Sequence, residues 1–152
     1  MTKTDHALWM RQAIDLASVA GQQGDVPVGA IVLNPQGEVV GRGFNNREVA
    51  GDPVGHAEIV AIRQAAETLG SWRLDDHTLV VTLEPCTMCA GAAVQTRVAR
   101  LVFGAFDEKA GAVGSLWDVV RDRRLPHRME VTSGVLAADC ANLLSDFFKA
   151  QR

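Results

Sequence analysis

Apolar residues recur at helical spacing, three or four positions apart, along several stretches of this chain. The first stretch covers residues 5–22 and ends before Gly24, and the second covers residues 56–69. An Ala-rich stretch at residues 86–95 and an amphipathic one at residues 136–149 follow the same spacing. Such spacing places the apolar side chains on one face of a helix. We therefore predict an α-helix over each stretch.

Shorter apolar runs, rich in Val, Leu and Ile, lie between these helices. Turn-forming residues separate the first two runs at Asn34, Pro35 and Gly37, which predicts a β-hairpin. The polar residues 45–55 are expected to form a loop. A helix, a hairpin and then alternating helices and strands favour a three-layer α/β/α fold around a mixed five-stranded sheet. The predicted strands cover residues 28–33, 38–44, 78–83, 99–103 and 129–132.

The composition is typical of one globular domain. The chain has 152 residues, of which 47% are apolar and 22% charged, and it has no repeats or linker-like segment. We therefore expect a single domain over residues 1–152. No apolar run approaches the roughly 20 residues that a membrane helix needs, and residues 1–6 do not resemble a signal peptide. These features predict a cytoplasmic protein without a membrane partner.

The charge balance argues against a protein that binds every polyanion through charge alone. The formal net charge is −3 at pH 7. The densest basic stretch is at residues 121–128. Contact with nucleic acid is therefore expected to be local and on the C-terminal half of the chain.

Two short motifs carry the candidate chemistry. The first is His-Ala-Glu at residues 56–58, and the second is Pro-Cys-Thr-Met-Cys at residues 85–89. Zinc prefers nitrogen and sulfur ligands in tetrahedral geometry, and a catalytic site keeps one position open for water. The two cysteines are three apart, so both sulfurs face one way on a helical first turn. We predict one catalytic Zn²⁺ per subunit, held by His56, Cys86 and Cys89.

Glu58 is the predicted catalytic acid–base group. It lies two residues from His56, so it can lie beside the open zinc position without being a ligand. Zinc lowers the pKa of its bound water from about 15.7 to about 7. A neighbouring carboxylate can then accept a proton and pass it to a substrate. These residues together predict a zinc-activated water with an acid–base group beside it.

Each motif alone has a plainer interpretation. A Cys-X-X-Cys pair is also typical of half a structural zinc site or of a redox pair, and His-X-Glu is often only a helix start. A structural site needs a fourth ligand. None of the remaining candidates has motif spacing to the cysteine pair, and Cys140 is expected to be a buried core thiol. The other candidates, His6, His77 and His127, are expected at the surface or in loops. The joint signature is typical of zinc deaminases that act on bases.

Nearly the whole chain resembles the bacterial tRNA-specific adenosine deaminases of the cytidine deaminase-like superfamily. The resemblance includes VPVGA at residues 26–30, GHAEI at 55–59 and TLEPCTMCAGA at 82–92. The segments GAVGSL at 111–116 and LLSDFF at 143–148 narrow it to the tRNA enzymes. Two departures, Pro126 where the family often has Asn and a short, less basic C-terminal end, concern contacts with RNA and not the metal site.

The resemblance implies a homodimer that converts adenosine to inosine at the wobble position of a tRNA anticodon. It implies that His56, Cys86 and Cys89 bind zinc and that Glu58 moves protons. It also implies the substrate contacts. Asn45 would hydrogen-bond the flipped base, Asp107 would lie near its sugar or backbone, the N–H of Ala57 would contact the oxygen being added, and Phe147 and Phe148 would help to hold the anticodon stem-loop.

Several alternatives remain open at this point. Asn45 is also suited to capping a turn, and Asp107 to forming one. Phe147 and Phe148 are adjacent, so we expect one in the core and the other free. The three tryptophans, Trp9, Trp72 and Trp117, are expected to be packing residues. Rival functions are a deaminase of a free base or nucleoside, of guanine or cytosine type, and a nucleic-acid-binding module with a structural zinc.

Overall fold

The order of the strands brings three strand ends to one edge of the sheet. The computed structural model describes residues 2–151 and has the strand order β2-β1-β3-β4-β5. Strand β1 (Gly29–Leu33) pairs antiparallel with β2 (Val39–Phe44) and with β3 (Thr78–Leu83). Strand β3 pairs parallel with β4 (Arg100–Ala105), which pairs parallel with β5 (Glu130–Thr132). The prediction of a mixed five-stranded sheet is confirmed.

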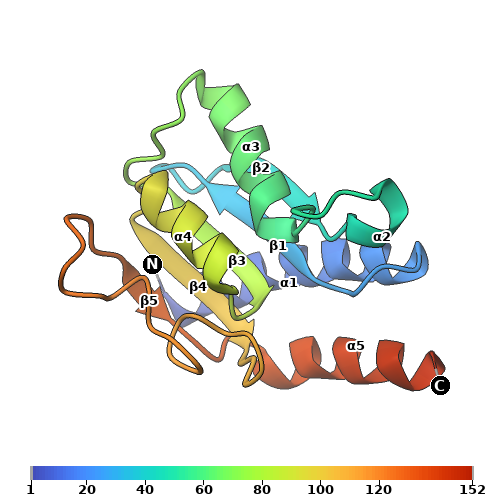
Figure 1. Ribbon diagram of the computed structural model, residues 1–152. Coiled ribbons are helices and arrows are strands. Elements are labelled where there is room, and N and C mark those ends of the chain that lie inside the picture. The colour runs from blue at the N-terminus through green and yellow to red at the C-terminus, as the bar shows by residue number, and fades with distance from the viewer. Residues whose placement is uncertain (1, 152) are drawn as a thin grey trace.

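Helices cover both faces of this sheet. Figure 1 shows α3 (Ala57–Leu69) and α4 (Thr87–Gln95) on one face, with α1 (Lys3–Gln22) and α5 (Ala137–Ala150) on the other. The three-layer arrangement is therefore as predicted. In the described residues no helix combines the length and the apolar character that crossing a membrane requires.

The alternation of side chains along the strands divides the interior into two cores. On β1, Ala30 and Val32 belong to the core under α3 and α4, whereas Ile31 and Leu33 belong to the core against α1 and α5. Successive side chains of a strand point to opposite faces, so a strand buried on both faces is apolar at every position. Cys140 of α5 is buried in the second core, as predicted.

The first turn of α3 lies very close to β2. A Cβ on Gly43 would lie 2.3 Å from the carbonyl oxygen of Ala57, so only glycine permits this approach. The contact brings the start of α3 beside the end of β2. His56 and Glu58 therefore lie near Asn45, the residue that follows β2.

The carboxyl ends of β2, β3 and β4 meet at one edge. Strands β2 and β3 are each antiparallel to β1, so they run in the same direction, and β4 is parallel to β3. The segments that leave this edge begin with Asn45 after β2, Glu84 after β3 and Phe106 after β4. In open α/β sheets, ligands bind outside the carboxyl ends of the strands.

The segment 45–55 differs from the predicted loop, because it contains the short helix α2 (Arg47–Ala50). The buried carboxylate of Asp25 accepts hydrogen bonds from the backbone N–H groups of Glu48 at 2.9 Å and Val49 at 3.2 Å. Asp25, which holds this helix, lies more than twenty residues before it, so the local sequence gives no sign of the helix. A four-residue helix is also too short to show apolar periodicity.

Two of the three tryptophans lie differently from the prediction. Trp72 and Trp117 are each 60% exposed, so neither is a packing residue. Trp72 follows the end of α3, and its ring lies 5.8 Å from the guanidinium of Arg73. His77 lies in the loop before β3, which agrees with the prediction, but it is buried there, and its ring Nδ1 hydrogen-bonds the carbonyl oxygen of Asp75 at 2.8 Å. These positions follow from turn geometry, which residue type does not reveal.

Candidate active site

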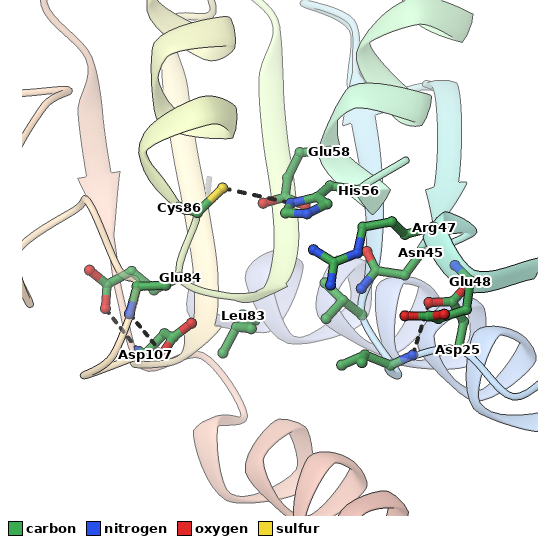
Figure 2. Close-up of a pocket in the computed structure, with 13 residues that line it drawn as sticks. Asp25, Asn45, Arg47, Glu48, His56, Glu58, Leu83, Glu84, Cys86 and Asp107 are labelled. Carbon is green, nitrogen blue, oxygen red and sulfur yellow. Dashed lines mark hydrogen bonds between the residues drawn. The ribbon is translucent and has the colours of Figure 1, made fainter. Parts of the chain in front are cut away.

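A pocket opens at the edge where β2, β3 and β4 end. Figure 2 shows its lining, which comes from five different parts of the chain. The lining includes most of the predicted metal and catalytic residues. Its members are Asp25, Val26, Val28, Asn45, Arg47, Glu48, His56, Glu58, Leu83, Glu84, Cys86, Asp107 and Ala110.

His56, Cys86 and Cys89 form one cluster beside this pocket. His56 and Cys86 are the N-cap residues of α3 and α4, and Cys89 is in the first turn of α4. The Nδ1 atom of His56 lies 3.6 Å from the Sγ of Cys86 and 3.5 Å from the Sγ of Cys89. Tetrahedral zinc with its usual bond lengths sets N···S separations of about 3.6 Å. The three side chains therefore fit a zinc ion.

Protons are shared unequally among these three groups. A hydrogen bond from Cys89 lowers the pKa of the Cys86 thiol to about 4, although burial partly opposes it. The same hydrogen bond, together with burial, raises the pKa of Cys89. The pKa of His56 is raised, chiefly by its hydrogen bond to Cys86. One sulfur is thus already a thiolate, the form that binds a metal.

Glu58 lies in the first turn of α3, beside His56 (Figure 2), and is only 4% exposed. Burial raises the pKa of its carboxyl to about 7, while its own backbone and His56 partly oppose the rise. A group with a pKa near 7 gives up and regains a proton easily at neutral pH. The position and the pKa both suit acid–base catalysis.

Asn45 is fixed to the start of α3. Its Oδ1 accepts a hydrogen bond from the backbone N–H of Ala57 at 2.9 Å. That N–H therefore has a protein partner, unlike the expectation that it contacts the oxygen being added. The Nδ2 group of Asn45, which has no hydrogen bond to other described residues, can donate to a base in the pocket. Asn45 thus both caps α3 and lines the pocket.

Asp107 lies in the turn after β4 and lines the opposite side of the pocket (Figure 2). Its Oδ1 accepts hydrogen bonds from the backbone N–H groups of Lys109 at 3.1 Å and Ala110 at 3.2 Å. Asp107 is therefore a turn former, as one interpretation proposed. The same turn holds its side chain at the pocket.

The two phenylalanines of α5 lie outside this pocket, and neither is in the core. Phe148 is 48% exposed and Phe147 is half-buried, so the prediction that one is a core residue is wrong. Their rings contact edge to face at 5.5 Å. Phe148 lines a second groove that shares Leu83 and Asp107 with the pocket. Helix α5 extends past the sheet edge here (Figure 1), which leaves Phe148 uncovered.

Four charged residues of the pocket were missed by sequence reasoning: Asp25, Arg47, Glu48 and Glu84. Asp25 holds α2, as described above. Arg47 is exposed at the rim, where its charge opposes the rise in the pKa of His56. Glu84 is 2% exposed, and hydrogen bonds from Ser115, Asp107 and Val113 outweigh its burial, so its pKa is lowered. An acid directly after an apolar strand was the available signal for Glu84.

The sequence and the fold are similar to those of known deaminases. Residues 3–105 match the family model of the cytidine and deoxycytidylate deaminase zinc-binding region. The tRNA-specific adenosine deaminase of Haemophilus influenzae is 48% identical over 143 residues, covering 94% of this chain and 83% of the relative.

Two solved structures give the comparison in three dimensions. A tRNA:A34 deaminase, studied for A-to-I editing at the wobble position of transfer RNA, matches with a TM-score of 0.85 and 40% identity. The match covers 90% of this chain and 98% of that one. The guanine deaminase of Nitrosomonas europaea matches with a TM-score of 0.77 and 26% identity, over 93% of this chain and 83% of the other.

Proposed function

The chain belongs to the tRNA-specific adenosine deaminase family. We propose that it removes the amino group of the wobble adenosine in a tRNA anticodon by hydrolysis. Water and adenosine are consumed, and inosine and ammonia are released. The gathering of His56, Cys86 and Cys89 beside the buried Glu58 carries this proposal. The whole chain acts as one domain in this reaction.

His56, Cys86 and Cys89 hold one Zn²⁺ in each subunit. The bound metal supplies Lewis acidity that makes water a stronger nucleophile at neutral pH. The sulfurs lie at the start of α4, where the helix dipole favours their thiolate forms. His56 and Cys86 also line the pocket, so a metal held by the three side chains would lie beside the substrate.

Glu58 moves the protons. It accepts one proton from the attacking water and donates it to the ring nitrogen of the adenine, then accepts the remaining proton of the added hydroxyl and passes it to the departing amine. Each transfer needs a group that is stable both with and without the proton, which a pKa of about 7 provides.

The remaining pocket residues hold the substrate. The Nδ2 group of Asn45 donates to the flipped base, and Ala57 fixes the orientation of that amide through its N–H. The carboxylate of Asp107 accepts a hydrogen bond from a hydroxyl of the ribose. Phe148 offers an exposed aromatic face for a neighbouring base, and its half-buried neighbour Phe147 supports it.

The proposal includes a homodimer in the cytoplasm that acts on tRNA. Its direct test is incubation of purified protein with an anticodon stem-loop, followed by detection of inosine. We expect inosine from the stem-loop and no ammonia from free guanine, cytosine or their nucleosides. Turnover of a free base with no inosine in RNA would favour the nucleobase deaminase instead. No ammonia from any substrate, with a fourth protein ligand on the metal, would favour a structural zinc module.

A further inference from the structure

Glu84 is a buried carboxylate to which the proposed reaction gives no role. It follows β3 directly and stands two residues before Cys86. Its side chain is 2% exposed, although it contributes to the wall of the pocket. Burying a carboxylate is costly unless hydrogen bonds compensate for the lost water. The partners of Glu84 therefore indicate what it does.

All of these partners belong to the loop that follows β4. Backbone N–H groups donate to the carboxylate from Asp107 at 3.0 Å, from Val113 at 3.0 Å and from Ser115 at 3.1 Å. The hydroxyl of Ser115 donates a further hydrogen bond. The two carboxylate oxygens thus accept four hydrogen bonds from residues 107–115.

The loop is closely folded around this carboxylate. A Cβ on Gly111 would lie 2.3 Å from the carboxyl carbon of Glu84, so only glycine leaves room for it. The N–H of Ala112 donates to the carbonyl oxygen of Pro85 at 2.8 Å, and Gly111 forms a β-bridge with Cys86. The loop therefore lies against the segment that leads into α4.

We propose that Glu84 is a positioning residue, whose carboxylate holds residues 106–116 in the conformation that presents Asp107 to the substrate. Figure 2 shows Glu84 and Asp107 side by side at one wall of the pocket, joined by a hydrogen bond. The part that concerns the substrate rests on the proposed function. The part that concerns the loop does not.

The first experiment measures the loop directly. In Glu84→Gln an amide NH₂ faces N–H donors, so one oxygen no longer accepts from them. Amide hydrogen exchange of Asp107, Val113 and Ser115 should accelerate about 10-fold or more, the scale of a lost charge-assisted hydrogen bond. Amides of β3 and α4 should keep their exchange rates. Uniform acceleration across the protein would show a merely structural role and overturn the proposal.

The second experiment measures the substrate. With a stem-loop substrate, Glu84→Gln should raise KM about 10-fold while kcat changes less than about threefold, because binding and not chemistry is affected. In an Asp107→Ala background, the same substitution should change KM by about twofold or less, because the side chain through which Glu84 acts on the substrate has been removed. An equal effect in both backgrounds would overturn the proposal.

Two further variants complete the test. Glu67→Gln makes the same chemical change at an exposed position of α3 and should leave exchange rates and KM unchanged. Ser115→Ala removes one donor, so it should accelerate hydrogen exchange in the loop and raise KM, each by less than Glu84→Gln does. If Glu84→Gln does not fold, Ser115→Ala tests whether this hydrogen-bond network positions the loop. If the wild type forms no inosine, the proposed function fails, but hydrogen exchange still tests whether Glu84 holds the loop.

Discussion

The side-chain oxygen of Asn45 accepts a hydrogen bond from the backbone N–H of Ala57 at 2.9 Å, so the residue after β2 is fixed to the first turn of α3. One amide thus serves two purposes. Its oxygen caps α3, the helix whose N-cap residue is the predicted metal ligand His56, and its nitrogen remains available to a base in the pocket. The two purposes can be separated by substitution.

Asn45→Asp should keep the helix cap and lose the donor to the base. A carboxylate at a helix start accepts the same hydrogen bond and suits the helix dipole. We therefore expect the melting temperature to change by less than about 3 °C. The value of kcat/KM for a stem-loop should fall about 10- to 100-fold, the scale of an unsatisfied hydrogen-bonding group.

The control is Asn142→Asp at an exposed position of α5, which should leave kcat/KM unchanged. Asn45→Ala should lose both stability and turnover, because it removes cap and donor together. Full activity of Asn45→Asp would show that the amide nitrogen does not contact the substrate.

Glu58→Gln should retain zinc and lose turnover. The amide keeps the size of the side chain but cannot accept or return a proton, and general acid–base catalysis contributes about 10²- to 10⁴-fold. Single-turnover assays should show a fall in kcat of that size, with about one zinc per chain by elemental analysis. Glu67→Gln serves as the matched control. A kcat close to that of the wild type would show that Glu58 is not the acid–base group of the reaction.

Cys86→Ser should lose zinc. A hydroxyl is a poor ligand beside a thiolate and an imidazole, and the metal stabilises the fold in which its ligands are brought together. The zinc content should fall well below one per chain, and the melting temperature should fall by about 5 °C or more.

Cys140→Ala provides the comparison for Cys86→Ser. Cys140 is 1% exposed in the core against α1 and α5, so this variant should also lose stability, by about 1 kcal/mol. It should nevertheless keep its zinc. Equal zinc contents in the two variants would contradict the proposed ligand set.

The parts of the fold that depend on local pattern were predictable from sequence. The helices have apolar periodicity, the strands are short apolar runs, and the predicted metal ligands stand at helix starts with fixed spacing. Cys86 and Cys89 are brought together by one turn of α4, so their spacing alone indicates that the two sulfurs lie close together. The position of His56 beside them needed the joint signature, because it depends on how α3 and α4 lie on the sheet.

The parts that depend on distant contacts were not predictable. Helix α2 exists where Asp25 accepts hydrogen bonds from it across more than twenty residues. The loop that presents Asp107 is organised by Glu84, also more than twenty residues away. Asp25 has no local feature that distinguishes it from a solvated acid, and Glu84 has only its position directly after an apolar strand. Their burial is decided by the strands that end beside them.

The zinc-free protein should show a pH-dependent cost of burying Glu58. Its pKa is raised from 4.5 to about 7, so the folded state favours the protonated carboxyl. The stability that this group contributes is fully present below about pH 4.5 and is lost as the pH rises through about 7. At pH 8 the loss should be on the order of 3 kcal/mol relative to pH 4.5.

Glu58→Gln should remove this dependence, because the amide does not ionise. Zinc-free wild type and Glu58→Gln should therefore have similar free energies of unfolding near pH 4.5, and the variant should be the more stable by on the order of 3 kcal/mol at pH 8. Urea unfolding of both proteins after chelation, from pH 4.5 to 8, measures the difference. Glu67→Gln should follow the wild type throughout. A constant gap between wild type and Glu58→Gln would mean that Glu58 ionises as readily inside the protein as in water.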